Sequence, residues 1–436
     1  MPDRLSDVTI ETGRTKSSPF QRRYITIQRL RRVRAAYPRQ FWILIFALLI
    51  NGIGGSMVWP FLTIYMRERL GVPLTVVTLL FSVNSLATLI AVSVVGPLVD
   101  RFGRKRAMLF GLILHSITLV AMSFTINLPI WAIIMVLQGV ASPVYRVAVD
   151  AMVADLIEPQ RRVDAYAALR MSSNLAITIG PAVGGFVSAF SYRLAFFVAA
   201  GANLFFVFLV IVAVQETLQR AAADAQATAA AGYGPVLRDR RFMAFSVITI
   251  IATMPAALMM MLLPVYAKEN FGVAEAQYGF IMATNAAMVV LFQMAVSRVS
   301  QRYPALPVLT LGGILYAIGT GSVALGRGFW AFWLSMVVMT VGELLLVPTA
   351  TALAANMAPA DMRGRYMGVY SLGWGVASGI GPVIGGMLND TIAPAATWLA
   401  GLGFGLLSAA GYAWMGLRRS ASPGRRAGAE YAKSAE

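Results

Sequence analysis

The sequence predicts an all-α polytopic membrane protein in which twelve transmembrane helices form two pseudo-symmetric six-helix bundles. Three observations predict this fold: an apolar composition, twelve apolar runs of membrane-spanning length, and an internal repeat. Of the 436 residues, 58% are hydrophobic and 13% are charged, whereas soluble domains contain roughly 45–50% and about 25%. This excess of apolar side chains is expected to face lipid.

The apolar runs determine the number of helices. A helix needs about 20 mostly apolar residues to cross the hydrocarbon core of a bilayer, and twelve runs meet this requirement. The predicted spans are 41–66, 75–97, 107–126, 130–153, 164–189, 193–214, 242–267, 275–297, 305–325, 329–353, 366–388 and 393–416.

The distribution of basic residues predicts the orientation. A net charge of +17 suggests a nucleic-acid partner in a soluble protein, but Lys and Arg also accumulate in the cytoplasmic loops of membrane proteins. With the N-terminus inside, the cytoplasmic segments contain 29 basic residues and the outer loops 5, while Arg146 and Arg170 lie inside spans. We therefore expect a multi-pass protein of the cell inner membrane, with both termini cytoplasmic and no nucleic-acid partner.

Composition also divides the chain into segments. Residues 215–240 have an Ala-rich centre followed by Gly and Pro, which is typical of a linker. We expect no cleavable signal before the first span, and residues 21–39 fit either a basic amphipathic helix on anionic lipid or a disordered tail that sets the topology. The predicted segments are a basic cytoplasmic tail (1–40), a six-helix bundle (41–214), a cytoplasmic linker (215–240), a second six-helix bundle (241–416) and a cytoplasmic C-terminal tail (417–436).

The second half of the chain repeats the first. A shift of 201 residues, without a gap, aligns identical residues of spans 1–5 with spans 7–11. Both copies enter the membrane in the same direction because six spans separate them, so we expect a substrate site between the halves near mid-membrane. The aligned pairs include Tyr65 with Tyr266, Gly71 with Gly272, Asn84 with Asn285, Gly111 with Gly312 and Arg162 with Arg363.

The loop after the second span carries the most specific motif. Gly103 permits a tight turn, the cations that follow can meet lipid phosphates, and Asp100 can accept hydrogen bonds from neighbouring helix N-termini. Asp155, at the inner end of span 4, is the expected partner of Arg104. Ordinary positive-inside charges are the alternative, but they do not explain the spacing of Gly and Asp. The motif residues are Gly96, Asp100, Arg101, Gly103 and Arg104.

This loop resembles the GxLaDrxGrk signature of the major facilitator superfamily, and residues 40–416 resemble its twelve-helix drug:proton antiporters. The resemblance implies that Asp100, Arg104 and Asp155 form a gate that latches the cytoplasmic side when the protein is open outward. The second-half counterpart, Gln301-Arg302-Tyr303, no longer matches the signature.

Span 5 carries a second motif, which recurs in span 11. It resembles the antiporter motif gxxxGPxxGG of drug exporters, although Ala176 replaces its first glycine. Small residues at these spacings let helices approach closely, and proline supplies a bend. The resemblance favours export over import, with generic small-residue packing as the alternative. The two copies are Gly180, Pro181, Gly184 and Gly185, and Gly381, Pro382, Gly385 and Gly386.

Glu343 is the main candidate for chemistry within the membrane. It lies about 14 residues into span 10, roughly 20 Å from the outer end, and no basic residue stands at i±3 or i±4. A carboxylate at this depth must be protonated, face water or pair across a cavity. We predict that it binds a proton or a cationic substrate, and its surrounding sequence resembles a span-10 pattern of some multidrug exporters. A structural ion pair is the alternative.

Other polar residues lie inside the predicted spans. Arg146 and Asp150 stand one turn apart and can neutralise each other, or Arg146 can pair with ionised Glu343 across the cavity and be released on protonation. Gln138-Gly139 matches the end of a further family motif, whose usual arginine falls at Met135. The candidates for the cavity wall, each also suited to an interhelical hydrogen bond or an interfacial position, are Asn51, Trp59, Asn84, Gln138, Asn285 and Trp374.

Together these features predict a proton-coupled antiporter that exports small hydrophobic or amphiphilic compounds by alternating access. Its expected partners are the substrate, protons and membrane lipids, and it is expected to act as a monomer with no cofactor besides the proton gradient. A lipid or glycolipid flippase, or a sugar or metabolite exporter, of the same fold is the alternative. A non-transporting sensor is a further one.

The sequence gives little support for an enzymatic function. The sequence contains no HExxH, GxSxG or GxxxxGK[ST] motif and no cysteine for a thiolate metal site. The single histidine, His115, is expected to be structural. The missing phosphate loop also argues against an ATP-driven pump.

Overall fold

The computed structural model describes residues 37–218, 234–359 and 362–420, and within these ranges the chain folds into helices joined by short turns. Twelve helical segments are long and apolar enough to cross a membrane, which confirms the predicted fold class. Most of the two predicted tails and of the predicted linker lies outside the described residues.

The helices of the two halves follow one another in the same order. The first half contains α2 (Arg39–Val58), η1 (Trp59–Phe61), α3 (Leu62–Leu70), α4 (Leu74–Phe102), α5 (Arg104–Phe124), α6 (Leu128–Leu156), η2 (Pro159–Arg161), α7 (Arg162–Phe190) and α8 (Tyr192–Ala213). The second contains α9 (Gly234–Arg238), α10 (Arg240–Met261), α11 (Leu263–Phe271), α12 (Glu275–Ser300), α13 (Ala305–Gly321), η4 (Ser322–Ala324), α14 (Phe329–Met357), α15 (Arg363–Thr391) and α16 (Ala396–Ser420).

Local sequence explains where several helices begin and end. Both α3 and α11 end at a left-handed glycine, Gly71 with φ 63° and Gly272 with φ 64°, a conformation that disfavours other residues. Asn127, Ser191 and Asp239 precede α6, α8 and α10, and their side chains accept backbone N–H hydrogen bonds from the first turn. Side chains of these types cap helix N-termini well.

The structure contains the repeat that the sequence indicates. The helices α10 to α15 begin 201 residues after their counterparts α2 to α7, when α10 is matched with α2 and α11 with α3. The register changes only at the last pair, because α16 begins at Ala396, 204 residues after Tyr192 of α8. The two halves are therefore two copies of one bundle.

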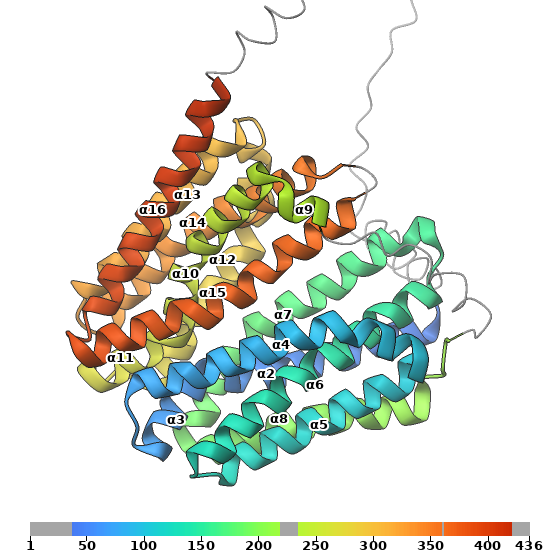
Figure 1. Ribbon diagram of the computed structural model, residues 1–436. Helices are drawn as coiled ribbons and strands as arrows, with labels where there is room; N and C mark the ends of the chain where they lie inside the picture. The colour runs from blue at the N-terminus through green and yellow to red at the C-terminus, as the bar shows by residue number, and fades with distance from the viewer. Residues whose placement is uncertain (1–36, 219–233, 360–361, 421–436) are drawn as a thin grey trace, which may run out of the picture.

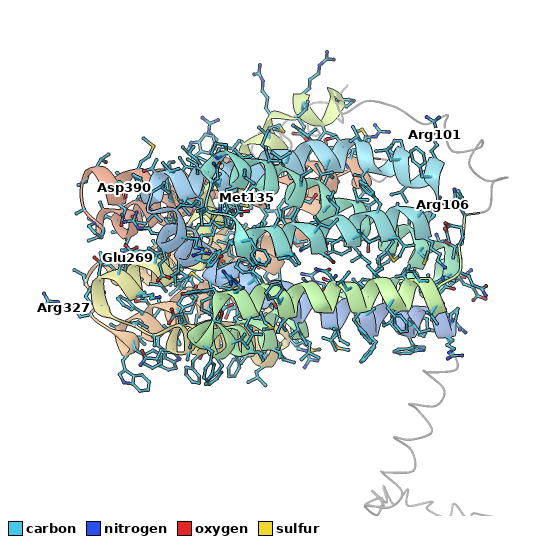
Figure 2. The ribbon with its side chains drawn as sticks, turned by 90° about the horizontal axis from the view of Figure 1, so that it is seen from below. Arg101, Arg106, Met135, Glu269, Arg327 and Asp390 are labelled. Carbon is cyan, nitrogen blue, oxygen red and sulfur yellow. The ribbon has the colours of Figure 1, made fainter. Side chains whose placement is uncertain are left out.

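The halves lie side by side, with α4 packed along α15 and α7 along α12. We call the end where α8 finishes and α10 begins the linker end, and the end that carries α3 and α11 the far end. Figure 2 shows Arg101 and Arg106 at the linker end and Glu269, Arg327 and Asp390 at the far end. In Figure 1 the halves meet at the far end and diverge toward the linker end.

The polar contacts between the halves lie toward the far end. The deepest joins the Ser82 hydroxyl, eight residues into α4, to the Gly379 carbonyl of α15. Toward the linker end the side chains of Arg146 and Arg170 are exposed instead. The described conformation is therefore closed at the far end and open at the linker end.

Candidate functional site

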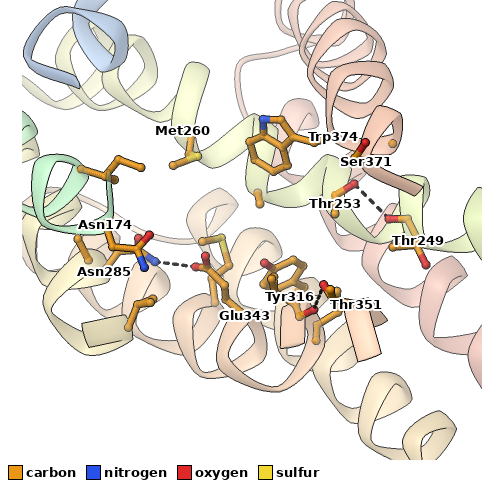
Figure 3. A pocket seen from close by; sticks show the side chains of 18 of the residues that line it. Asn174, Thr249, Thr253, Met260, Asn285, Tyr316, Glu343, Thr351, Ser371 and Trp374 are labelled. Atoms are coloured by element: carbon orange, nitrogen blue, oxygen red, sulfur yellow. Dashed lines mark hydrogen bonds between the residues drawn. The ribbon is translucent and has the colours of Figure 1, made fainter. Parts of the chain in front are cut away.

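A cavity of about 390 Å³ lies between the halves (Figure 3). One wall comes from α7 of the first half, and the others come from α10, α12, α13, α14 and α15 of the second. Four methionines and three aromatic residues give it a largely apolar and adaptable lining. They are Met260, Met282, Met336, Met339, Tyr316, Tyr370 and Trp374.

Glu343 supplies the carboxylate of this cavity. It stands at the midpoint of α14, fourteen residues from Phe329 and fourteen from Met357, or about 21 Å from either end. Asn285 of α12 donates an amide hydrogen bond to Glu343 Oε2 over 2.8 Å, and its Nδ2 also lies 2.8 Å from Thr340 Oγ1. Figure 3 shows the acid group directed into the cavity.

No cation is fixed beside this carboxylate in the described part of the chain. The ion pairs found there do not include Glu343, Arg146 or Asp150. Arg146 thus forms an ion pair with neither Asp150 nor Glu343 in this conformation, in which the side chains of Arg146 and Asp150 are exposed. Its charge still acts on Asp150, one turn away. An amide that donates to Glu343 suits a group that gains and loses a proton, because the second carboxyl oxygen is left for the proton.

The structure corrects the expected cavity wall for four of six candidates. Asn285 and Trp374 line the cavity, as expected. Asn51 donates instead to Asn203 of α8 over 2.6 Å, and Asn84 donates to the Met135 carbonyl of α6 over 2.9 Å. Both amides are buried between helices of the first half, where an interhelical hydrogen bond satisfies them.

Gln138 and Trp59 also lie away from this cavity. Gln138 is buried, its carbonyl accepts from the Thr118 hydroxyl, and its Nε2 lies 2.9 Å from His115 Nε2. Trp59 packs edge-on against Phe81, with ring centroids 5.3 Å apart. These residues join neighbouring helices of one half, so their polar and aromatic character reflects packing within the bundle.

The motif of the loop after α4 forms a charge cluster at the linker end. Arg104 Nη2 lies 3.1 Å from Asp100 Oδ1, and Arg104 Nε lies 3.0 Å from Asp155 Oδ2. The expected pairing of Arg104 with Asp155 is present. Gly103 has φ 96°, as expected of a tight turn. Arg101 is exposed, and a Cβ on Gly96 would meet nothing within 4 Å.

Glu216 is a member of this cluster that the sequence did not single out. Its carboxylate accepts from the backbone N–H groups of Arg104 and Lys105, over 3.0 and 3.1 Å, and so caps the N-terminus of α5. We expected Asp100 to take such a role, but Asp100 is held by Arg104. A Cβ on Gly103 would lie 2.5 Å from Glu216 Oε2. The feature of the sequence that could have identified Glu216 is its position shortly after the sixth predicted span.

The two adjacent glycines of α7, and the two of α15, contact different halves of the protein. A Cβ on Gly184 would lie 2.3 Å from the Met57 carbonyl oxygen within the same half, whereas one on Gly185 would lie 2.7 Å from the Glu275 carbonyl oxygen of the other half. The second copy behaves likewise, because Gly385 faces Leu258 of its own half and Gly386 faces Leu74 of the other. The first glycine of each pair lets helices pack inside a bundle, and the second lets the two bundles touch.

The other motif residues lie in the same helices. Gly180 packs within its half, because a Cβ there would lie 1.9 Å from Ser56 Oγ of α2. Gly381 faces Met254 of α10, also within its own half. Pro181 and Pro382 are buried inside α7 and α15, where each removes one backbone hydrogen bond.

Charged residues at the far end form a reciprocal pair of contacts. Arg67 Nε of α3 lies 2.7 Å from Glu269 Oε1 of α11, and Lys268 Nζ of α11 lies 2.6 Å from Glu68 Oε1 of α3. We call these four residues the far-end clamp. The shift of 201 residues maps Arg67 onto Lys268 and Glu68 onto Glu269, so the repeat makes the interface self-complementary. This recurring basic-acidic dipeptide was the signal that the sequence interpretation missed.

Two further carboxylates support the clamp. Glu275 lies 2.5 Å from Lys268 Nζ and accepts from the Tyr192 hydroxyl over 2.6 Å, while Asp390 accepts from the backbone N–H and hydroxyl of Thr75, each over 2.7 Å. Burial lowers the pKa of Lys268, but the hydrogen bonds to Glu275 and Glu68 outweigh it and hold that pKa above its ordinary value. The lysine's contribution is therefore present at neutral pH and is lost only as the pH rises through the raised pKa.

The clamp is expected to bias the conformational equilibrium modestly. The side chains of Arg67 and Glu269 are 25% and 41% exposed, and such pairs contribute about 0.2–1 kcal/mol. Arg67→Glu replaces attraction by repulsion, so we expect the far end to open roughly fivefold more often. Because the chain has no cysteine, labelling of a Ser82→Cys variant by an impermeant maleimide measures this opening.

The reciprocal variant serves as the control for the clamp. Arg67→Glu combined with Glu269→Arg should restore the low labelling of the parent, whereas Lys268 is unsuited to such a swap because Glu275 also lies 2.5 Å from its Nζ. Equal labelling of the single and double variants would mean that the pairs do not hold the halves together.

A family model described as Major Facilitator Superfamily matches residues 44–268 and again residues 245–435. Among curated proteins, a Na(+), Li(+), K(+)/H(+) antiporter of Planococcus maritimus is 26% identical over 401 residues, covering 82% of this chain and 91% of its own. The multidrug resistance protein MdtH of Yersinia pestis is 25% identical over 391 residues, covering 87% and 94%. An uncharacterized MFS-type transporter of Bacillus subtilis, YttB, is 27% identical and covers 81% and 89%.

Solved structures share the fold at low sequence identity. The nucleoside transporter NupG superposes with a TM-score of 0.72 at 13% identity, covering 87% of this chain and 99% of that one. A peptide transporter POT in complex with sulfate superposes with a TM-score of 0.70 at 17% identity, covering 87% and 95%. These similarities support the arrangement of helices and carry no information on the substrate.

Proposed function

The chain belongs to the Major Facilitator Superfamily and is a membrane transporter, and we propose that it exports small hydrophobic or amphiphilic compounds in exchange for protons. The observation that carries this proposal is Glu343, a carboxylate at mid-membrane depth in the wall of a largely apolar cavity. It is hydrogen-bonded by an amide and forms no ion pair with any cation of the described residues.

The surroundings of Glu343 support a two-state proton carrier. An ionised carboxylate at this depth is costly unless water or a cation reaches it, so a proton or a cationic substrate stabilises it and the two compete. By linkage, a proton that weakens substrate binding is weakened by substrate to the same extent. Asn285 can donate to either the ionised or the protonated acid, which keeps the side chain in place throughout the cycle.

Orientation gives the exchange its direction. We place the linker end in the cytoplasm, because basic residues concentrate there on the positive-inside rule, and we place the chain in the inner membrane as a monomer. The described conformation then opens to the cytoplasm, where substrate enters. Opening of the far end releases substrate and admits a proton to Glu343. The ion pairs of Asp100, Arg104 and Asp155 already form within the first half in the described conformation, and we propose that this cluster latches the cytoplasmic side in the second state by contacting the other half.

The relatives leave the cargo open, and the cavity favours an organic one. One relative is named as an antiporter of Na(+), Li(+) and K(+), and another as a multidrug resistance protein. A dedicated site for a small cation needs several converging oxygen ligands. Hydroxyl and amide groups do line this cavity of about 390 Å³, but its surface is largely apolar and includes four methionine and three aromatic side chains. Its size and lining suit an amphiphile. A lipid or glycolipid would need an opening toward the bilayer.

Reconstitution tests the proposed function. We expect purified protein in liposomes with an imposed pH gradient to move lipophilic dyes against their concentration gradient, and the movement to stop when an ionophore collapses the gradient. A panel of dyes, antibiotics, fluorescent lipids and alkali cations separates the candidate cargoes. Movement of lipid or alkali cation alone would replace the proposed cargo, and movement of dye that is indifferent to the pH gradient would remove proton coupling.

A further inference from the structure

No residue of α6 is among those that line the cavity, but the repeat identifies the face of α6 that corresponds to the cavity face of α14. Glu343, Val347 and Thr351 occupy successive turns of α14, and all three line the cavity. The shift of 201 residues maps Val347 onto Arg146 and Thr351 onto Asp150. Arg146 and Asp150 therefore lie on the face of α6 that corresponds to the cavity face of α14.

A second arginine lies on the cavity face of α7. Asn174, Ile177 and Thr178 of this helix line the cavity, and Arg170 stands one turn before Asn174 toward the linker end. Residues four positions apart share a helix face. The repeat agrees, because Arg170 corresponds to Ser371 of α15, which also lines the cavity.

Neither arginine forms an ion pair within the described ranges, although the charge of Arg146 acts on Asp150, one turn away. Both side chains are exposed, and the ion pairs found there include neither. Arg146 is ten residues from Leu156 and Arg170 is eight residues from Arg162, which places them about 15 and 12 Å from the linker ends of their helices. Charged side chains at such depths face water-filled space and not lipid.

Arg146 and Arg170 are not among the residues that line the cavity, but their helix faces and the repeat direct them toward the same space as Glu343, so that the two halves carry opposite charges there. Asp150, one turn from Arg146, offsets only one of the two positive charges of the first half. Glu343 is the charged residue among those that line the cavity in the second half. Along the helices, the arginines lie about 6 to 9 Å nearer the linker end than Glu343 does. That separation fits a molecule with a positive group at one end and a negative group at the other.

We infer that the transported compounds are dipolar, with a cationic group held by Glu343 and a carboxylate held by Arg146 and Arg170. Guanidinium groups bind carboxylates through paired, parallel hydrogen bonds, and the methionine and aromatic lining between the charges accommodates an apolar body. This inference rests on the proposed export function and deepens it by naming the substrate class.

A matched pair of dyes tests the inference on the full-length protein in liposomes. A rhodamine free acid carries both charges, and its methyl ester lacks only the anionic one. For Arg146→Gln combined with Arg170→Gln, we expect the dissociation constant of the free acid to rise at least about tenfold. The loss of one strong charged hydrogen bond commonly has an effect of this size. The constant of the ester should change little. Arg327→Gln, at the far end, is the control.

The conservative variant guards against a folding defect. Arg146→Lys combined with Arg170→Lys keeps both charges and should recover most of the binding of the free acid. Equal loss of both dyes, or no loss of the free acid, would overturn the inference. Wild-type binding of the ester without the free acid would also overturn it and leave the proposed export standing, whereas binding of neither dye contradicts both.

Discussion

Transport driven by a pH gradient is expected to fall to the rate of protein-free liposomes when Glu343 is replaced by Gln. In the parent protein Asn285 donates to a carboxylate oxygen of Glu343 over 2.8 Å. Gln has the same size and keeps an oxygen that can accept this hydrogen bond, so the fold should remain intact. The amide cannot take up or release a proton. Proton coupling is therefore lost. Dye should still equilibrate down its own gradient, but more slowly because a neutral amide holds a cationic group less well, as fluorescence measured with and without the pH gradient will show.

An exposed glutamate gives the matched control for this variant. Glu158 lies at the linker end just before η2, and Glu158→Gln should leave the pH-driven rate unchanged. Unimpaired accumulation of dye by the Glu343→Gln variant would remove Glu343 from the coupling step. A simultaneous loss of pH-driven and downhill movement, in a variant with normal thermal stability, would instead indicate that the carboxylate serves substrate binding alone.

The sequence predicted the fold because membrane insertion and duplication both leave periodic signals. Twelve apolar runs and a constant shift of 201 residues determine helix number, order and pseudo-symmetry without reference to any contact. Glu343 was found for a related reason, since an ionisable group at mid-span stands out against an apolar background.

The sequence could not show which partner each polar residue selects. Asn84 and Asn285 are equivalent by the repeat, yet Asn84 donates to the Met135 carbonyl while Asn285 donates to Glu343. That difference follows from the side chains across the helix interface, where the counterpart of Glu343 in the first half is Ser142. An amide at mid-span predicts a hydrogen bond, and the neighbouring helix decides whether it faces the cavity.

The interfaces between the halves were the hardest to predict. The two glycines of each GG pair are adjacent in the sequence, but one packs inside its bundle and the next touches the other bundle. A helix turns by about 100° per residue, so neighbours in the sequence face different helices. Only the relative position of the two bundles distinguishes a folding contact from one that breaks and re-forms during transport.

Substitution at Gly185 is expected to shift the conformational equilibrium more than any change in the far-end clamp. A Cβ there would lie 2.7 Å from the Glu275 carbonyl oxygen and 3.2 Å from the Gly279 Cα, and backbone atoms cannot move aside as a flexible side chain can. Such overpacking costs about 1–3 kcal/mol, against about 1 kcal/mol or less for an exposed ion pair. In Gly185→Val this cost falls only on the conformation that is closed at the far end.

We therefore expect Gly185→Val to fold, to stay open at the far end and to label about tenfold faster at Ser82→Cys than the parent. Gly386→Val should act alike, because a Cβ there would lie 3.2 Å from the Leu74 carbonyl oxygen of the other half. Gly184→Val, which meets Met57 of its own half, should instead lower thermal stability. A Cβ on Gly201 would meet nothing within 4 Å, so Gly201→Val should change neither the labelling rate nor the thermal stability. If a folded Gly185→Val variant is labelled at the same rate as the parent, the added methyl groups have been accommodated without moving the halves apart. That result would show that the contact between α7 and α12 at Gly185 does not separate during transport.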